Sequence, residues 1–187
     1  WTGWATLMYN VPMGLSLGLC GWAGVGHDVG AFAGPRPSRE LFVRWVPQGV
    51  LQPRFVIPSG FTPHGPCSEP WMLPELLPPV RAALPLRSRL VPLLHSLHLE
   101  AFLHGRPVAR PLICHHADGA ADGADRPSAE SFTYTLGASL LAASVLRPLS
   151  DTSAAEDGSG QWHVALPRGA RAGRGGLLGN AHQRLCD

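Results

Sequence analysis

A single acid in a glycine-rich stretch is the residue of this chain best placed to do chemistry. Asp28 stands in G-H-D-V-G-A-F-A-G, directly after the short apolar run Gly21–Val25. An apolar strand that ends on an acid at a Gly-rich loop is how a (β/α)8 barrel delivers a side chain to its active-site mouth. A plain turn is the competing interpretation, because Asp and Gly also form tight loops. On these residues alone, the turn is the more common case.

Other charged residues border the same stretch. Glu40 and Arg44 lie four residues apart on a predicted helix, where a surface ion pair worth a few tenths of a kcal/mol is the simplest interpretation. Arg54, in Q-P-R-F-V-I, either pairs with an acid near this site or stays solvated, and the residues leave both open. Glu69, before Pro-Trp, is predicted to tether a loop.

The histidines raise the question of a metal site. His95 and His98 are three residues apart, and His104, His115 and His116 follow. A zinc site needs three or four converging ligands, usually with an acid or Cys at a defined spacing. That pattern is missing here, so we predict neither a metal nor a cofactor.

The elements that must position these residues alternate in the first half of the chain. Apolar residues at helical spacing predict a helix over Trp4–Leu19, although Pro12 would kink it. Ser38 is a suitable N-cap for a second helix that Gly49 would end. The remaining expectations are a strand at Gly21–Val25, a loop at Gly30–Pro37, a strand at Val50–Ile57, a loop at Pro58–Pro70, and a proline-broken helical region from Trp71 to about His104.

After Gly105 the pattern changes to short strands separated by turns, which is typical of a β-sandwich or a sheet layer. We therefore place a domain boundary near Gly105. The expected strands are Pro107–Cys114, Phe132–Tyr134, Ser139–Val145 and Gln161–Leu166, with a loop over Ala117–Ser128.

Composition excludes several partners. All fifteen basic residues are Arg, the net charge is only +2, and the arginines are scattered from Arg36 to Arg184. We therefore expect no nucleic-acid partner, because no basic stripe follows a phosphate backbone. The apolar run Val11–Val25 is shorter than the roughly 20 residues of a spanning helix, so we expect no membrane insertion.

The four widely spaced cysteines are predicted to be free and mostly buried thiols. The chain begins at Trp1 without Met, as expected of a piece of a longer protein.

Taken together, the motifs resemble glycoside hydrolase family 31, the α-glucosidase and α-xylosidase group. They cover roughly residues 1–170, in order and with sensible spacing. The matching pieces are W-T-G, V-P-M-G-L-S-L-G-L-C-G, G-H-D-V-G-A-F-A-G, E-L-F-V-R-W, Q-P-R-F-V-I, S-E-P-W-M, the R-x-R-L-V-P of Arg87–Pro92, and G-R-P-V-A-R-P-L.

The resemblance implies an α/β fold: the last strands and helices of a (β/α)8 barrel, followed by a partial β-sandwich domain. Residues 1–105 would be the C-terminal part of the catalytic barrel and residues 106–168 the sandwich. The Arg/Gly-rich residues 169–187 are predicted to be a disordered tail.

The resemblance also implies roles for individual residues. Asp28 would bind sugar hydroxyls, which makes this role the preferred one over a plain turn. Trp1 and Phe32 would form apolar walls for the sugar ring, and Arg54 would be a further substrate-binding residue. The family places its nucleophile on an earlier strand, and its acid/base is an Asp directly after W-T-G. Here Trp4 follows, so no catalytic residue is assigned.

Further departures affect binding and stability. Pro58 stands where the family has a sugar-contacting His, and Ala31 replaces the second of two glycines. Pro47 and Pro85 fall inside predicted helices. A proline in a helix interior destabilises the helix by about 3 kcal/mol or more. These departures predict a degraded or truncated copy, and an error in the reading frame would give the same pattern.

Two functional hypotheses follow. The first is a glycoside hydrolase that resembles α-glucosidases, cleaves terminal α-linked glycosidic bonds with retention, and is inactive as this isolated chain. The second is a non-catalytic carbohydrate-binding or interaction remnant. The expected partner is a carbohydrate, an α-glucoside substrate, and neither hypothesis fixes an oligomeric state.

Overall fold

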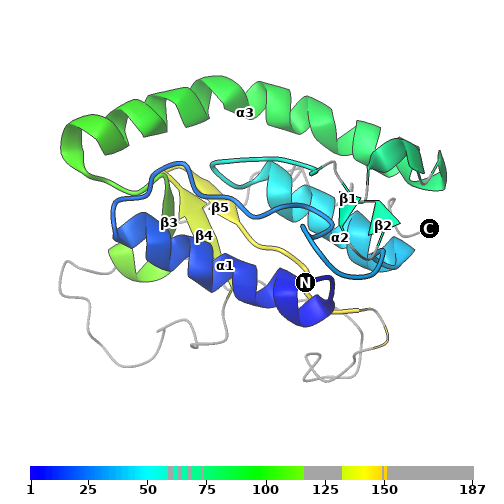
Figure 1. The fold of residues 1–187 in the computed structure, drawn as a ribbon. Helices are drawn as coiled ribbons and strands as arrows, with labels where there is room; N and C mark the ends of the chain where they lie inside the picture. The colour runs from blue at the N-terminus through cyan, green and yellow to red at the C-terminus, as the bar shows by residue number, and fades with distance from the viewer. Residues whose placement is uncertain are drawn as a thin grey trace.

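The protein was analysed as a computed structural model that describes residues 1–58, 61–62, 65–66, 69–72, 74–115, 132–148 and 150. Three α-helices dominate these described residues: α1 (Trp4–Leu19), α2 (Arg39–Val50) and α3 (Leu77–His104). α3 runs along the top of the molecule in Figure 1, with α1, α2 and a small sheet below it. The short elements are β1 (Phe61–Thr62), β2 (Gly65–Pro66), η1 (Pro70–Met72), η2 (Pro74–Leu76), β3 (Ala109–Pro111), η3 (Leu112–His115), β4 (Tyr134–Leu136) and β5 (Leu140–Ala142).

α1 confirms the predicted helix, with the same bounds. Its inner face buries Leu7 and Val11, in agreement with the helical spacing of its apolar residues. Pro12 lies inside the helix without ending it. Other large apolar residues of α1, among them Met13 and Leu17, remain exposed. α1 therefore has one packed face and one partly uncovered apolar face.

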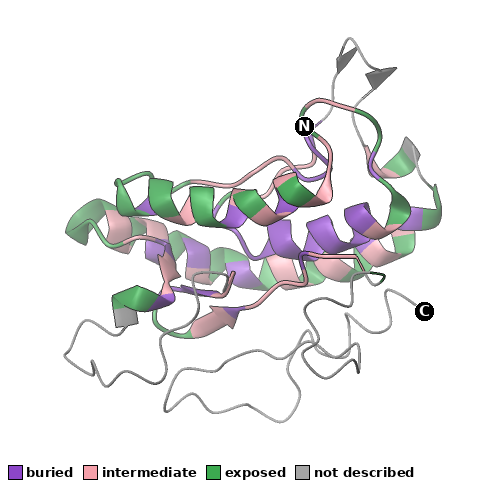
Figure 2. Ribbon diagram, turned by 90° about the horizontal axis from the view of Figure 1, so that it is seen from below, coloured by how far each residue is buried: buried purple, intermediate pink, exposed green. Residues whose placement is uncertain are grey.

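α2 is the buried centre of the fold, as the purple helix in Figure 2 shows. The Ser38 hydroxyl accepts a hydrogen bond from the Leu41 N–H at 3.3 Å, which confirms the predicted N-cap. The helix continues through Pro47 and past Gly49, ending at Val50. Because residues 41–50 are all buried, tertiary packing outweighs the local cost of the proline and glycine.

α3 starts later than expected. Residues 70–76 form the two 3-10 turns η1 and η2, and the α-helix begins only at Leu77, with prolines in its first turn. Proline is tolerated there, since the first N–H groups of a helix have no partner inside it. Gly105 ends the helix with φ of 67°, and its N–H donates to the Ala101 carbonyl at 2.9 Å.

The predicted strands before and after α2, Gly21–Val25 and Val50–Ile57, are wrong in both position and length. Residues 20–24 continue from α1 as turns, and residues 51–54 continue from α2 in the same way. Parallel pairing begins further along the chain, with one bridge between Asp28 and Val56. The Arg54 N–H donates to Val25 O at 3.2 Å, and the Val29 N–H donates to Val56 O at 3.0 Å. Segments 25–29 and 54–56 thus run side by side in the same direction.

The C-terminal strands form an antiparallel sheet in the order β3-β4-β5. β3 and β5 are shorter than predicted, whereas β4 has the predicted length but begins at Tyr134, where the expected strand ended. This sheet is attached to the helices, since the buried Tyr134 hydroxyl donates to the Leu51 carbonyl at 3.1 Å. The expected loop 117–128, the strand 161–166 and the tail 169–187 lie outside the described residues.

One sequence expectation about side chains requires correction. Cys20 and Cys114 are free but exposed, so the prediction of mostly buried thiols is wrong for them; Cys67 and Cys186 lie outside the described residues. Trp45 is fully buried, whereas Trp22 and Trp71 are exposed. No helix in the described part of the chain is long and apolar enough to cross a membrane.

Candidate functional site

Asp28 and Arg54 are brought together from two segments that are 26 residues apart. Arg54 Nη1 lies 3.1 Å from Asp28 Oδ1, and the same nitrogen donates to the Gly26 carbonyl at 2.9 Å. Of the two open interpretations of Arg54, pairing is the correct one. The side chains are 49% and 25% exposed, so the pair contributes at most about 1 kcal/mol to stability. Its geometry leaves both groups accessible to a ligand.

Backbone contact between the two segments sets this geometry. A Cβ at Gly26 would lie 2.0 Å from the Arg54 carbonyl oxygen, so only glycine allows the approach. On the next residue, the His27 N–H donates to Gln52 Oε1 at 3.0 Å. Gln52 is nearly fully buried. The glycine and the glutamine together hold Asp28 beside Arg54.

Arg87 fastens the turn that carries Arg54. Its guanidinium donates to the Val50 carbonyl at 3.0 Å, to the Pro53 carbonyl at 2.8 Å, and to the Gln52 carbonyl. These acceptors lie at and just after the C-terminus of α2, where carbonyls lack helical partners and a positive charge is favourable. Sequence reasoning missed Arg87 and Gln52 as supporting residues, although R-x-R-L-V-P was already visible as a motif.

The predicted aromatic walls lie near the loop that follows Asp28. Trp1 and Phe32 are 66% and 68% exposed. The Trp1 ring would lie 3.2 Å from a Cβ at Gly34, and the Thr2 hydroxyl donates to the Ala33 carbonyl at 3.4 Å. The first residues of the chain are therefore joined to the loop that begins at Asp28.

Two departures from the family pattern have structural consequences here. Ala31 has φ of 76°, in the left-handed region that suits glycine, which costs roughly 1–2 kcal/mol for a residue with a Cβ. Pro58 is buried, and its side chain offers no hydrogen-bonding group.

The Glu40–Arg44 pair differs from the expected surface contact. The two charged groups are 4.0 Å apart, at the limit of an ion pair, and the Arg44 side chain is only 5% exposed. Arg44 is thus part of the core around α2 and does not lie on a solvated helix face.

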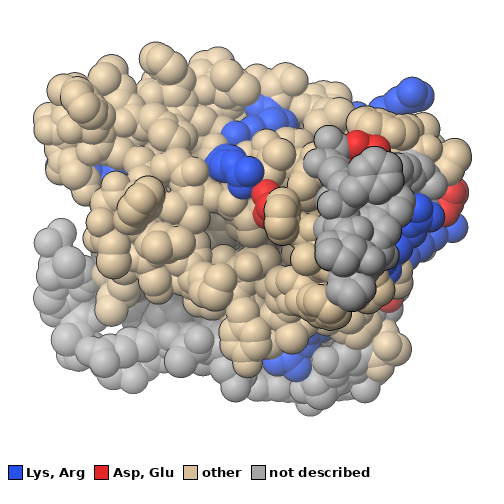
Figure 3. Space-filling model, viewed as in Figure 1, with Lys and Arg blue, Asp and Glu red and all other residues tan. Residues whose placement is uncertain are grey.

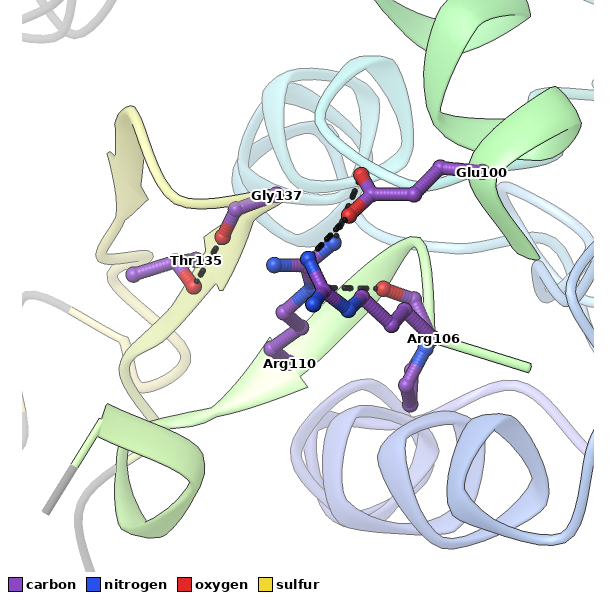
Figure 4. Close-up of polar contacts among 6 residues, drawn as sticks. Glu100, Arg106, Arg110, Thr135 and Gly137 are labelled. Atoms are coloured by element: carbon purple, nitrogen blue, oxygen red, sulfur yellow. Dashed lines mark hydrogen bonds and ion pairs between the residues drawn. The ribbon is translucent and has the colours of Figure 1, made fainter. Parts of the chain in front are cut away.

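A second ionic cluster lies at the far end of α3. Figure 4 shows the Glu100 carboxylate facing Arg106 and Arg110, with both contacts at 3.0 Å. The hydrogen bond from Arg106, reinforced by Arg110, lowers the pKa of Glu100. Arg110 also donates to the Pro107 carbonyl at 2.8 Å. This cluster joins the end of α3 to β3.

His27 is the titratable side chain with the most unusual surroundings near the site. Its ring lies 6.0 Å from that of Trp45, and both ring nitrogens are buried without a hydrogen-bond partner in the described part of the chain. Burial lowers the pKa of His27 from 6.5 to about 4. The imidazole is therefore neutral at pH 7.

Acidification should destabilise the protein through His27. The folded-state pKa of about 4 lies below the ordinary value of 6.5, so the unfolded chain binds the proton more tightly. The contribution of neutral His27 to stability is fully present above about pH 6.5 and is lost as the pH falls toward 4. We expect the free energy of unfolding, measured with urea, to be about 2 kcal/mol lower at pH 5.

The substitution His27→Asn should flatten this acid limb. The matched control is His95→Asn, because His95 is exposed on α3 and its loss should leave the profile unchanged. An identical acid limb in His27→Asn would contradict the assignment.

Charged groups are sparse around the site. In Figure 3 the arginines lie in separate places on the face shown and form no continuous stripe. Within the described residues, no three His, Cys, Asp or Glu side chains are grouped as a metal site would require. Hydrogen bonding to a neutral polar ligand is the chemistry that Asp28 and Arg54 offer.

Comparison with known proteins defines the class. Residues 1–97 match the model of the TIM-barrel domain of glycosyl hydrolases family 31. The chain belongs to this family.

The similar proteins are much longer. The chain is 34% identical to neutral alpha-glucosidase C of Mus musculus over 162 residues, which is 81% of this chain and 17% of that protein. It is 34% identical to the alpha-glucosidase of Hordeum vulgare over 170 residues, which is 87% of this chain and 18% of the relative. The chain therefore spans less than a fifth of the length of these relatives.

Solved structures agree with this result. The cycloalternan-degrading enzyme from Trueperella pyogenes superposes with a TM-score of 0.67 at 26% identity, over 79% of this chain and 21% of that chain. The family 31 alpha-glucosidase from Bacteroides thetaiotaomicron superposes with a TM-score of 0.61 at 28% identity, over 76% of this chain and 23% of that one. The arrangement of helices and small antiparallel sheet is thus one that family 31 enzymes contain.

Proposed function

We propose that this chain supplies the sugar-binding wall of a glycoside hydrolase site that takes α-glucosides. The observation that carries the proposal is the 3.1 Å pair between Asp28 and Arg54. It lies where two parallel segments end, within the residues that match the barrel domain. Ligands of (β/α)8 enzymes bind at that end of the strands. The similar proteins named as alpha-glucosidases support a glucoside as the ligand.

Each of the four predicted residues has a chemical part in this proposal. The Asp28 carboxylate accepts hydrogen bonds from two neighbouring sugar hydroxyls, and Arg54 donates to the sugar oxygens. The exposed rings of Trp1 and Phe32 cover the apolar C–H face of the sugar. An uncharged, hydroxyl-rich ligand fits this combination of one carboxylate, one guanidinium and two aromatic rings.

We further propose that the 187-residue chain binds the sugar without hydrolysing it. Retaining glycosidases need two carboxylates about 5–5.5 Å apart. The residue after W-T-G is Trp4, the first residue of α1, so the family's acid/base position holds no acid. In this proposal residues 1–105 are the C-terminal part of a barrel and residues 106–168 belong to a sandwich domain. This proposal combines the two functional hypotheses, because the site would still bind the sugar specifically but would not hydrolyse it.

Calorimetry with maltose tests the proposal. The intact chain should bind maltose with a millimolar dissociation constant, and Asp28→Asn should weaken binding at least tenfold, because hydrogen bonds to a charged group contribute about 1.5–3 kcal/mol. Glu75→Gln is the matched control, because it removes an exposed carboxylate on η2 and should leave binding unchanged. A thermal melt of each variant checks that the fold is kept.

Three outcomes would contradict the proposal. No heat at millimolar maltose would remove the binding role, and equal binding by Asp28→Asn would move the site elsewhere. Hydrolysis of an aryl α-glucoside by the pure chain would overturn the non-catalytic part.

A further inference from the structure

His27 and Asp28 are consecutive residues whose side chains lie on opposite sides of the segment 25–29. The Asp28 carboxylate lies 3.1 Å from Arg54, on the side of the candidate site. The His27 ring lies on the other side, 6.0 Å from the ring of Trp45 on α2. Successive side chains of an extended segment alternate in this way. One short segment therefore connects the proposed sugar-binding carboxylate to the core around α2.

The surroundings of the His27 ring suit its neutral form. Both ring nitrogens are buried, and neither has a hydrogen-bond partner in the described part of the chain. The backbone N–H of His27 is already bonded, since it donates to Gln52 Oε1 at 3.0 Å. A buried cation needs an acceptor for each of its N–H groups. The ring can therefore hold a second proton only when it moves into water.

The charges around the ring do not favour a cation either. The titratable side chains on the neighbouring elements are Glu40 and Arg44 on α2, Arg54 on the adjoining segment, Arg87 and His98 on α3, and Tyr134 on β4. Burial raises the pKa of Tyr134, which stays neutral. Among the described residues, neither nearby acid pairs with the ring, because Glu40 faces Arg44 and Asp28 faces Arg54.

A groove beneath α1 borders the ring without offering it a charged partner. It has a volume of about 190 Å³ and is lined by His27 together with residues of α1, of which Asn10 is polar and uncharged. Most of the lining is apolar, including the exposed side chains of Met13, Leu17 and Trp22. A protonated ring that turned into the groove would lie beside these apolar side chains. We therefore expect the ring to leave α2 together with its backbone.

Two backbone hydrogen bonds on either side of His27 hold the segment on its neighbour. The Arg54 N–H donates to Val25 O at 3.2 Å, and the Val29 N–H donates to Val56 O at 3.0 Å. A backbone that follows the ring away from α2 breaks both bonds. The aspartate next to the histidine then loses its contact with the arginine.

We propose that protonation of His27 opens the segment 25–29 and releases the sugar that Asp28 binds. Acid pH thus weakens binding at a site that is complete at pH 7. Histidine suits this role because its charge changes near physiological pH, and burial lowers the pKa of His27 to about 4. The release rests on the proposed sugar-binding function, whereas the opening of the segment does not. Coupling of this kind is reciprocal, so bound sugar should make His27 harder to protonate.

Amide hydrogen exchange of the full 187-residue chain, measured by NMR, tests the opening. The amides of Arg54 and Val29 report on it, because each donates across the two segments. A histidine with a pKa of about 4 in the closed form and 6.5 in the open form favours opening about twentyfold more at pH 5 than at pH 7. The protection factors of both amides should fall by about this factor. They should also stay at least tenfold below those of the α2 amides, as expected of a local opening.

Two histidine variants assign the effect to one ring. In His27→Asn, the protection factors of the Arg54 and Val29 amides should change less than threefold between pH 7 and pH 5. His98→Asn is the matched control, because His98 is also partly buried but its Nδ1 lies 2.7 Å from the Leu94 carbonyl oxygen. This variant should keep the twentyfold fall. A thermal melt at each pH checks that every variant is folded.

Calorimetry with maltose at the same two pH values tests the release. The dissociation constant of the unmodified chain should be at least threefold higher at pH 5 than at pH 7, whereas His27→Asn should bind equally at both. An absence of maltose binding at pH 7 would contradict the proposed sugar site instead. Hydrogen exchange would still decide whether the segment opens.

Four results would overturn the inference. The first is unchanged protection of the Arg54 and Val29 amides at pH 5, which would mean that the ring turns without its backbone. The second is an equal fall in His27→Asn. The third is equal protection of these amides and the α2 amides, which would indicate global unfolding. The fourth is equal maltose affinity of the unmodified chain at both pH values.

Discussion

Replacing Gly26 by Ala should lower the free energy of unfolding by about 4 kcal/mol or more. An added Cβ would lie 2.0 Å from the Arg54 carbonyl oxygen and 2.8 Å from its carbon. These are backbone atoms, so no side-chain rotation relieves the overlap and the two segments must separate. The typical stability of a domain is only about 5–15 kcal/mol, so chemical denaturation at pH 7 should show a large shift of the midpoint.

The matched control is Gly24→Ala, two residues earlier in the same segment. A Cβ there would meet only His98 Nε2 at 3.8 Å, an ordinary contact. We expect a change within about 0.5 kcal/mol. If Gly26→Ala were tolerated as well as Gly24→Ala, the close approach of the segments would not exist in solution. Because Arg54 leaves Asp28 when the segments separate, Gly26→Ala should also abolish maltose binding.

The second large effect is expected for Arg87→Ala, at about 3 kcal/mol. The guanidinium is the shared donor for the carbonyls of Val50, Gln52 and Pro53, and it lies 6.0 Å from the Phe55 ring centre. Removing it leaves acceptors at the end of α2 without their donor, at about 1–3 kcal/mol for each group that water does not reach. Burial lowers the pKa of Arg87, yet an arginine stays charged in proteins.

Two variants separate the geometry of this contact from its charge. Arg87→Lys keeps the charge but loses the fork of donors, so we expect about half of the loss. Arg89→Ala, an exposed position on the same helix, should change the unfolding free energy by less than about 0.5 kcal/mol. Equal effects at both positions would show that Arg87 does not hold the turn. Urea denaturation of the three variants side by side makes the comparison.

These two residues explain why the candidate site has its geometry. Asp28 is on one segment and Arg54 on the other, and neither segment is long enough to be a regular strand. Gly26 permits the contact, and Arg87 orders the turn between α2 and Arg54. The sugar-binding wall that we propose thus depends on supporting residues that do not touch the ligand.

The local elements with strong sequence signals could be predicted well. α1 has the expected bounds, Ser38 caps α2 as expected, and Gly105 ends α3. Periodicity, capping and the left-handed glycine act over a few residues, so a short window contains the information. The predicted positions of the strands around Asp28 are wrong, because the apolar residues assigned to these strands instead form the turns that follow α1 and α2.

The sequence by itself determined the family and the existence of the three helices of the described residues, because the order of motifs and the local residue preferences can be read along the chain. It also predicted Asp28 as a sugar-binding residue. Only the tertiary structure decided that Arg54 pairs with Asp28, that Arg44 is buried, and that Cys20 is exposed. It also decided that Gln52 and Arg87 hold the site and that a groove remains beneath α1. These outcomes depend on contacts between residues 25 to 37 positions apart and on which helix face packs against a neighbouring element. No local pattern encodes them.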